Sequence, residues 1–250
     1  MRILKLAETT STNSWLSTNE NNLEAPLMVY SEKQTAGRGQ RGASWESEPG
    51  KNLTASLLLR LESFQADKQF LISEAIALSI VELLSRHGVL AEIKWPNDIY
   101  VGNDKICGIL VENVVTGSEI TRTIAGFGLN VNQEKFISDA PNPVSMKMLT
   151  QTDYEIETLA NELSLFIENN LELLSEPELL HSRFMENLWR NDSHFYPFLD
   201  KKREELIYAR IDSVAPDGIL KLITTNGEPR NYAFKEIEFQ IENPEKPEEG

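Results

Sequence analysis

The sequence predicts an α+β fold in which a large mixed-sheet domain is followed by a small β domain. Strand-like and helix-like segments alternate over residues 1–194. Near Phe195 the chain changes to short alternating segments that are broken by turn signals. A chain of 250 residues is also long enough to bury one full core and to add a smaller domain. We therefore expect domains at 1–194 and 195–242.

In the first domain, apolar patterning places each element. Short strands are expected at 3–6 and 27–30, and Ser11, Thr12 and Asn13 offer N-caps for a helix between them. Residues 67–87 predict a helix lying against a sheet, which Gly88 ends; its apolar positions are Ile72, Ile76, Ile80, Leu83 and Leu84. Further strands are expected at 52–60, 91–95, 98–101, 105–115 and 119–131, and further helices at about 155–175 and 178–190.

The second domain is predicted from its turns. Pro216-Asp217-Gly218 is a hairpin signal, and Asn226-Gly227 marks a second tight turn. Short strands separated in this way suggest a small barrel of the SH3 type. Residues 243–250 are rich in proline and glutamate, and we expect them to form a disordered tail.

Composition limits the classes of function. The chain has 39 acidic and 24 basic residues, a formal net charge of −15, and this excess argues against nucleic-acid binding. A single cysteine, Cys107, excludes an intrachain disulfide and suits a reducing cytoplasm. The segment 1–6 is too short and too charged for a signal peptide, and no stretch is apolar enough to span a membrane. We expect a cytoplasmic protein with no nucleic-acid or membrane partner.

A glycine- and arginine-rich loop at 34–42 is the first candidate for chemistry. Its backbone N–H groups and the guanidinium groups of Arg38 and Arg41 can surround a phosphate or a carboxylate. The same residues match G-x-G-x-x-G, but the segment 43–50 that follows has no helical period, and no Lys-Ser or Lys-Thr pair follows the third glycine. A dinucleotide site and a P-loop are therefore disfavoured, and a flexible surface loop would not explain both arginines.

A second motif, Lys94-Trp95-Pro96-Asn97-Asp98, leads into a predicted hairpin. Regular alternation places Lys105 on the same face as Cys107 and Ile109, where a lysine either reaches out to solvent or meets an anion. A simple register puts Asp98 on the opposite face. If both residues belong to one site, a bulge or a twisted turn has to reconcile them.

Other reactive residue types have simpler interpretations. Cys107 is expected to be a small buried residue, and the histidines at 87, 181 and 194 show no metal-binding spacing. Before any resemblance is considered, Trp45 and Trp95 are more typical of a core or a loop anchor than of a ligand lid.

Five blocks, taken in order, carry a specific resemblance. They are Ser11-Thr12-Asn13, residues 34–42 with Trp45, Lys94 to Asp98, Lys105 to Leu110, and Gly126-Phe127-Gly128-Leu129-Asn130-Val131-Asn132. In order and spacing the chain resembles the biotin–protein ligases from residue 1 to about 240. The resemblance implies a class II synthetase-like catalytic domain of the biotin-ligase type and a small SH3-like β-barrel. The winged helix of the family's repressor members does not precede the first expected strand, so we expect a monofunctional ligase.

The resemblance implies a two-step reaction with ATP and Mg²⁺. Biotin is adenylated to biotinyl-5′-AMP, and the biotinyl group then passes to a lysine of a biotin carboxyl carrier protein or domain, as in acetyl-CoA carboxylase or a related biotin enzyme. Such chemistry depends on fixed cations rather than on a nucleophilic side chain. The site must also exclude water, because the mixed anhydride hydrolyses.

The resemblance also implies the site residues. Lys105, Arg38 and Asp98 are the expected catalytic residues, and no metal ligands are implied. The residues implied for biotin are Ser11, Thr12, Asn13, Gln34, Arg38, Gly39, Gln40, Trp45, Lys105 and Gly108. Those implied for ATP are Arg38, Arg41, Asn97, Lys105 and Asn130. The family often has arginine where this chain has Gln40, so shielding of the adenylate phosphate is expected to fall on Arg38 and Arg41.

Two alternatives stay open. A lipoate or octanoyl ligase or transferase shares the broad fold and the acylation of lysine, although the Gly-Arg-Gly loop favours biotin. A non-catalytic biotin sensor is the third hypothesis. Met146-Lys147-Met148 is similar to the sequence around the lysine that these ligases modify, but its segment shows no hairpin, and self-modification of Lys147 is disfavoured. The oligomeric state is not predicted.

Overall fold

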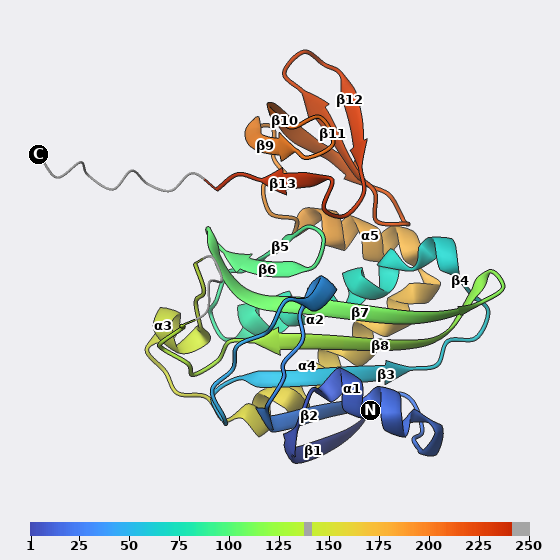
Figure 1. The fold of residues 1–250 in the computed structure, drawn as a ribbon, viewed down its shortest axis with the longest axis vertical. Helices are drawn as coiled ribbons and strands as arrows, with labels where there is room; N and C mark the ends of the chain where they lie inside the picture. The colour runs from blue at the N-terminus through green and yellow to red at the C-terminus, as the bar shows by residue number, and fades with distance from the viewer. Residues whose placement is uncertain (138–141, 242–250) are drawn as a thin grey trace, which may run out of the picture. The chain divides into compact units, whose positions relative to one another are not determined.

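The computed structural model describes residues 1–137 and 142–241, with only the backbone of Arg41 (Figure 1). The tail predicted at 243–250 lies outside the described residues. The chain forms two compact units, Met1–Trp189 and the part that begins at Arg190. Each unit is described by itself.

The centre of the first unit is an eight-stranded sheet. It is a mixed sheet, as the sequence predicted. Its strand order is β1-β2-β3-β8-β7-β6-β5, with β4 paired to β8. The pairing of β1 with β2 is parallel, whereas the other pairings are antiparallel. The strands are β1 (Arg2–Thr9), β2 (Leu27–Gln34), β3 (Leu53–Leu59), β4 (Phe64–Gln65), β5 (Glu92–Lys94), β6 (Asp98–Val101), β7 (Asp104–Thr116) and β8 (Glu119–Leu129).

Two helices cover one face of this sheet, and a third packs against one of them. Helix α2 (Phe70–Arg86) is buried along most of its length and packs against α4 (Ile156–Glu172) and α5 (Pro177–Glu186). Gly88, with φ +76°, follows the end of α2 as the sequence predicted. Figure 1 shows α2 and α4 lying across the sheet on the side away from α1. A short helix that the sequence did not predict, α3 (Met146–Thr150), follows β8.

Helix α1 (Thr12–Asn19) covers part of the opposite face. Leu16 packs there with Leu58 and Ile124 in a buried apolar cluster. Ser11 precedes the helix, but its side chain makes no capping bond. The prediction of a helix at this position is confirmed, whereas capping by the Ser11 side chain is not seen.

A β-bulge between β6 and β7 changes the face of Lys105. Asp98 pairs with Gly108 and Ile99 with Cys107, but Tyr100 pairs with Lys105, so the register shifts by one residue. A shift of one residue reverses the face to which a side chain points. The expectation that Lys105 shares a face with Cys107 and Ile109 was therefore wrong, and Lys105 lies beside Gly108 instead. The bulge brings Lys105 and Asp98 together, as a shared site requires.

The two edges of the sheet differ. The chain that follows α5 pairs with β5, because the Ile93 N–H donates to the Asn187 carbonyl at 2.7 Å and the Trp189 N–H donates to the Ile93 carbonyl at 2.9 Å. This segment extends the sheet and covers the β5 edge. At the other end of the strand order, β1 runs directly into Thr10 and Ser11.

The second unit contains a five-stranded antiparallel sheet in the order β12-β11-β10-β9-β13. Both predicted turns are present, with Gly218 and Gly227 at φ +90° and +78°. The strands are β9 (Tyr196–Asp200), β10 (Glu205–Val214), β11 (Leu220–Thr224), β12 (Pro229–Tyr232) and β13 (Ile237–Phe239). The small β domain is confirmed; its closure into an SH3-like barrel stays a prediction.

Within 1–137 and 142–241, no helix is both long enough and apolar enough to span a membrane.

Candidate functional site

A buried polar cluster lies where α1 begins. The side-chain oxygen Oε1 of Gln34 accepts from the Thr12 backbone N–H at 2.8 Å and from the Thr12 hydroxyl at 3.2 Å. The Ser56 hydroxyl of β3 lies 2.6 Å from Thr12 Oγ1 and also contacts the Asn13 amide oxygen. Four residues from three separate segments of the chain, three of them predicted for the site, are thus held together.

Glycines of β7 and β8 form a floor beside this cluster. A Cβ at Gly126 would lie 2.2 Å from Asn13 Oδ1, and one at Gly128 would lie 2.3 Å from the Trp45 indole. A Cβ at Gly108 would lie 2.9 Å from Trp45 Cζ3. Since real Cβ atoms do not come so close, only glycine allows Asn13 and Trp45 to approach the sheet in this way.

Two cations lie on the same face of the sheet. The Lys105 Nζ is 2.6 Å from Asp98 Oδ1, and both side chains are less than a quarter exposed. The Arg38 Nη2 is 2.8 Å from Glu112 Oε1. Glu112 follows Gly108 on β7 at the spacing that returns to the same face. Lysine and arginine side chains placed in this way can meet a carboxylate and a phosphate.

The indole of Trp45 lies against the glycine floor, with its ring centroid 5.6 Å from the Lys105 ammonium. Its Nε1–H is buried and has no hydrogen-bond partner. Trp45 is among the residues that the resemblance implies for biotin, and in the structure its ring lies beside Gly108 and Gly128. A buried indole N–H without an acceptor is unusual, since such groups are nearly always satisfied.

The loop that carries Arg38 is tied back on itself. The Gly39 N–H donates to the Ala43 carbonyl at 2.7 Å, and the Trp45 N–H donates to the Gly37 carbonyl at 3.0 Å. Gln40 opens a 3₁₀ turn (Gln40–Gly42), so no α-helix follows the glycines, as expected. The Arg41 side chain lies outside the described part of the structure.

The two asparagines predicted for ATP differ in their surroundings. The Asn97 Nδ2 donates to the Ile109 carbonyl at 2.7 Å, and the Asn97 carbonyl accepts from the Ile109 N–H. Asn97 thus ties the 94–98 motif to β7. The buried Asn130 amide donates to the Val144 carbonyl at 3.0 Å, while its Oδ1 has no partner. Asn130 therefore has an acceptor free for a ligand.

Sequence reasoning missed four residues of this arrangement, namely Ser56, Glu112, Gly126 and Gly128. The glycines belong to a block that carried the family resemblance but were not named as site residues. Ser56 was detectable as a polar residue inside an otherwise apolar strand, and Glu112 as a charge in the middle of a long strand. Neither signal says which residues lie opposite across the sheet.

Other reactive groups are accounted for by local structure. Cys107 is fully buried, and burial raises the pKa of its thiol well above the usual range. Burial also raises the pKa of Glu74, which lies 2.9 Å from His181 Nδ1. The Lys147 Nζ donates a hydrogen bond to Asp153 Oδ1 at 2.8 Å, and this bond raises the pKa of the lysine ammonium.

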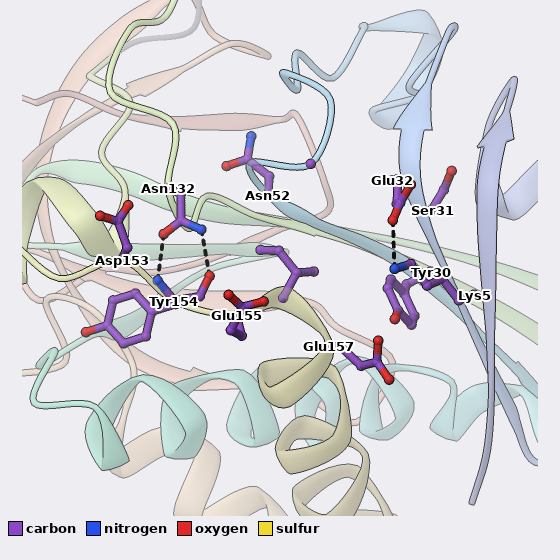
Figure 2. A pocket seen from close by; sticks show the side chains of 12 residues that line it. Lys5, Tyr30, Ser31, Glu32, Asn52, Asn132, Asp153, Tyr154, Glu155 and Glu157 are labelled. Carbon is purple, nitrogen blue, oxygen red and sulfur yellow. Dashed lines mark hydrogen bonds and ion pairs between the residues drawn. The ribbon is translucent and has the colours of Figure 1, made fainter.

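A separate pocket of about 340 Å³ lies between the start of α4 and strands β1 and β2 (Figure 2). Lys5 and Tyr30 line it, and they share the sheet face that α4 covers. Its polar groups bond one another, as in the Lys5–Glu32 ion pair at 2.7 Å and the two hydrogen bonds between Asn132 and the Tyr154 backbone. None of the predicted site residues lines this pocket.

Comparisons with known proteins agree with the motifs. Residues 3–130 match the biotin/lipoate A/B protein ligase family. The bifunctional ligase/repressor BirA of Escherichia coli is 35% identical over 122 residues, which is 48% of this chain and 38% of that protein. The biotin–[acetyl-CoA-carboxylase] ligase of Paracoccus denitrificans is 33% identical over 128 residues, 50% of this chain and 53% of that protein. The chain thus spans only about a third to a half of the length of such curated relatives.

Solved structures extend the likeness of fold over nearly the whole chain. The biotin protein ligase of Aquifex aeolicus, solved in complex with biotin and ATP, superposes with a TM-score of 0.77 at 21% identity, covering 96% of this chain and 99% of that one. The family match at 3–130 takes in the polar cluster, the arginine loop, the Lys105–Asp98 pair and the glycine floor. Because this match spans just over half of the 250 residues, the chain belongs to the biotin/lipoate A/B protein ligase family.

Proposed function

We propose that this protein is an ATP-dependent biotin–protein ligase. The observation that carries the proposal is the placement of Lys105 and Arg38 on one face of the sheet, beside a glycine floor and a buried polar cluster. The names of two relatives support biotin as the acid, since the Paracoccus protein is named a biotin–[acetyl-CoA-carboxylase] ligase and the Aquifex biotin protein ligase was solved in complex with biotin and ATP.

In the proposed first step, a carboxylate oxygen of biotin attacks the α-phosphorus of ATP. The bond from that phosphorus to the bridging oxygen breaks, and pyrophosphate leaves with the electron pair. The reaction brings two anions together and spreads negative charge over the transferring group. Lys105, held by Asp98, and Arg38 supply the positive charge on the same face of the sheet.

In the proposed second step, the amine of an acceptor lysine attacks the carbonyl carbon of biotinyl-5′-AMP, and AMP leaves. Asp98 is placed to orient the reacting groups around Lys105. The loop that carries Arg38 and Trp45 covers the floor, and exclusion of water there protects the mixed anhydride.

Mg²⁺ is included in the proposal as a partner of the ATP phosphates. In residues 1–137 and 142–241, no group of three or more His, Cys, Asp or Glu side chains is placed to hold a metal ion. This fits an ion that reaches the site on the nucleotide, because Mg²⁺ keeps several waters and binds through phosphates with few carboxylates.

The proposed protein partner is a biotin carboxyl carrier domain. We place its docking at the β1 edge, because the other edge of the sheet is covered by residues 187–189. Strand β1 leads straight into Ser11 and the polar cluster, so a strand added there brings its acceptor lysine beside the site.

Biotin-dependent release of pyrophosphate from ATP tests the proposed function. We expect release with biotin and little with lipoate or octanoate. Release with lipoate or octanoate alone would assign the chain to the other branch of its family. Biotin binding without pyrophosphate release would leave a sensor and contradict the ligase.

A further inference from the structure

Glu112 contacts two different segments of the candidate site and has no role in the two steps above. Its Oε2 accepts from Asn13 Nδ2 at 2.8 Å, and its Oε1 accepts from Arg38 Nη2 at 2.8 Å. One carboxylate of β7 thus joins the start of α1 to the arginine loop. A negative group in a site built for anions needs a reason to be there.

We propose that Glu112 is a positioning residue that aims the Arg38 guanidinium at the reacting groups. The inference rests on the proposed function for its kinetic consequence. Glu112 acts through Arg38 and is not itself required to touch a substrate.

The Glu112 oxygen Oε2 accepts from a side chain that is itself held in place. Asn13 is buried, its Oδ1 contacts the Ser56 hydroxyl, and the missing side chain of Gly126 lets it lie against the sheet. With its oxygen committed to Ser56, the Asn13 amide can present only its N–H groups to Glu112. This contact sets the position of the whole carboxylate.

The end that binds Arg38 leaves most of the guanidinium available. The contact uses Nη2, one nitrogen of a group that carries five N–H donors in a planar fork. The remaining N–H groups can donate to a carboxylate or a phosphate without breaking the contact with Glu112.

The exposure of the pair limits what it can contribute to stability. The Arg38 and Glu112 side chains are 47% and 41% exposed, and ion pairs of this kind contribute little to stability. An arginine on a loop loses much side-chain entropy when it is ordered. If Glu112 orders Arg38 in the free protein, less of that entropy remains to be lost in the transition state.

The kinetic test is a double-mutant cycle on pyrophosphate release with biotin. We expect Glu112→Gln to lower kcat by about tenfold with little change in the KM for biotin, as for a modest misplacement of a catalytic group. Arg38→Ala should lower it by about 10²–10³-fold. The double variant should be no slower than Arg38→Ala alone. Additive effects, or a Glu112→Gln enzyme as fast as the wild type, would overturn the proposal.

A matched control comes from the same hairpin. Glu119→Gln removes a charge at the far end of the β7–β8 pair, where Glu119 pairs with Thr116, and should leave kcat unchanged. Thermal unfolding of each variant separates a local effect from loss of the fold.

The second readout does not depend on activity. In the protein without substrates, the Arg38 guanidinium signals in ¹⁵N NMR should be resolved in the wild type and averaged in Glu112→Gln. Unchanged signals would contradict the inference whether or not the protein is a ligase. Averaged signals in a protein that releases no pyrophosphate would support the positioning role and count against the proposed function alone.

Discussion

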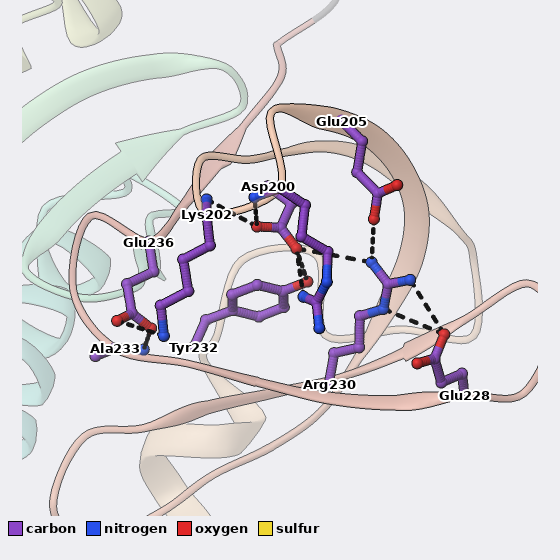
Figure 3. Close-up of polar contacts among 9 residues, drawn as sticks. Asp200, Lys202, Glu205, Glu228, Arg230, Tyr232, Ala233 and Glu236 are labelled. Carbon is purple, nitrogen blue, oxygen red and sulfur yellow. Dashed lines mark hydrogen bonds and ion pairs between the residues drawn. The ribbon is translucent and has the colours of Figure 1, made fainter.

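The two units of the molecule each contain a cluster of charged side chains, and the clusters differ in how completely their groups are paired. In the second unit the buried Asp200 accepts from the Tyr232 hydroxyl at 2.8 Å, from Arg203 Nη1 at 2.9 Å and from the N–H groups of Lys202 and Arg203 (Figure 3). Arg230 reaches Glu205 at 2.6 Å and Glu228 at 3.1 Å. Such a network holds strands and turns in place.

The candidate site is only partly paired. Lys105 and Arg38 have carboxylate partners, but Trp45 Nε1 and Asn130 Oδ1 are buried without one. Elsewhere in the described residues, the unmatched atoms of Glu20, Glu74 and Arg122 belong to groups that are already held in an ion pair. A cluster in which every group is satisfied stabilises the fold, whereas one with unmatched groups beside cations is suited to a ligand.

Among the substitutions that test this difference between the two clusters, Lys105→Ala should have the largest effect on activity. We expect biotin-dependent pyrophosphate release to fall by about 10²–10³-fold, because a preorganised cation at the transferring group is lost. Lys147→Ala is the matched control, since both lysine side chains are 23% exposed and both pair with an aspartate. Equal losses in the two variants would show that the effect is not specific to the site.

Asp200→Asn tests the other side of the comparison. The substitution leaves some of the donors that now bond the Asp200 carboxylate without an acceptor, and this should cost about 1–3 kcal/mol in the stability of the second unit. Hydrogen–deuterium exchange over residues 196–239 measures that loss, and kcat per folded molecule should not change. A fall in kcat without faster exchange would mean that this cluster is functional as well.

The same residue predicts a pH dependence with a definite sign. Burial alone would raise the pKa of Asp200, but the hydrogen bonds from Tyr232 and Arg203 outweigh it and hold the pKa below its usual value. A carboxyl with a lowered pKa contributes stability above its unfolded pKa of about 4 and loses it as the pH falls through the folded value. Exchange in the wild type should therefore accelerate below about pH 4 more steeply than in Asp200→Asn.

Local patterns predicted much of the fold. The period of Ile72, Ile76 and Ile80 identified α2, and the turns at Gly218 and Gly227 separated strands of the second unit, because these signals lie within a few neighbouring residues. The face of Lys105 was predicted wrongly, since one bulged residue reverses every side chain beyond it.

The site was predicted less completely than the fold for a related reason. Ser56 and Glu112 belong to the site because of strand pairing, which brings β3 and β7 to either side of β8. No spacing along the chain encodes that neighbourhood. Motif resemblance named Arg38, Lys105 and Asp98 as expected catalytic residues, but Glu112, the carboxylate that contacts Arg38, was identified only from the structure.

The smallest expected effect concerns the indole N–H groups of Trp45 and Trp189, of which one is an unpaired donor and the other a paired donor. Trp45 Nε1 has no partner, whereas Trp189 Nε1 donates to the Gly102 carbonyl at 2.8 Å. We expect the Trp45 N–H to gain an acceptor from the bound ligand, so that Trp45→Phe weakens biotin binding by about threefold to tenfold, the worth of one neutral hydrogen bond. Trp189→Phe should lower thermal stability and leave biotin affinity unchanged.

Calorimetric titration measures both affinities, and the ¹H–¹⁵N indole signal of Trp45 should move on biotin binding while that of Trp189 stays in place. If Trp45→Phe binds biotin as tightly as the wild type and its signal is insensitive to the ligand, the unpaired indole is a feature of the loop alone, and lack of pairing would no longer distinguish the site from the structural cluster.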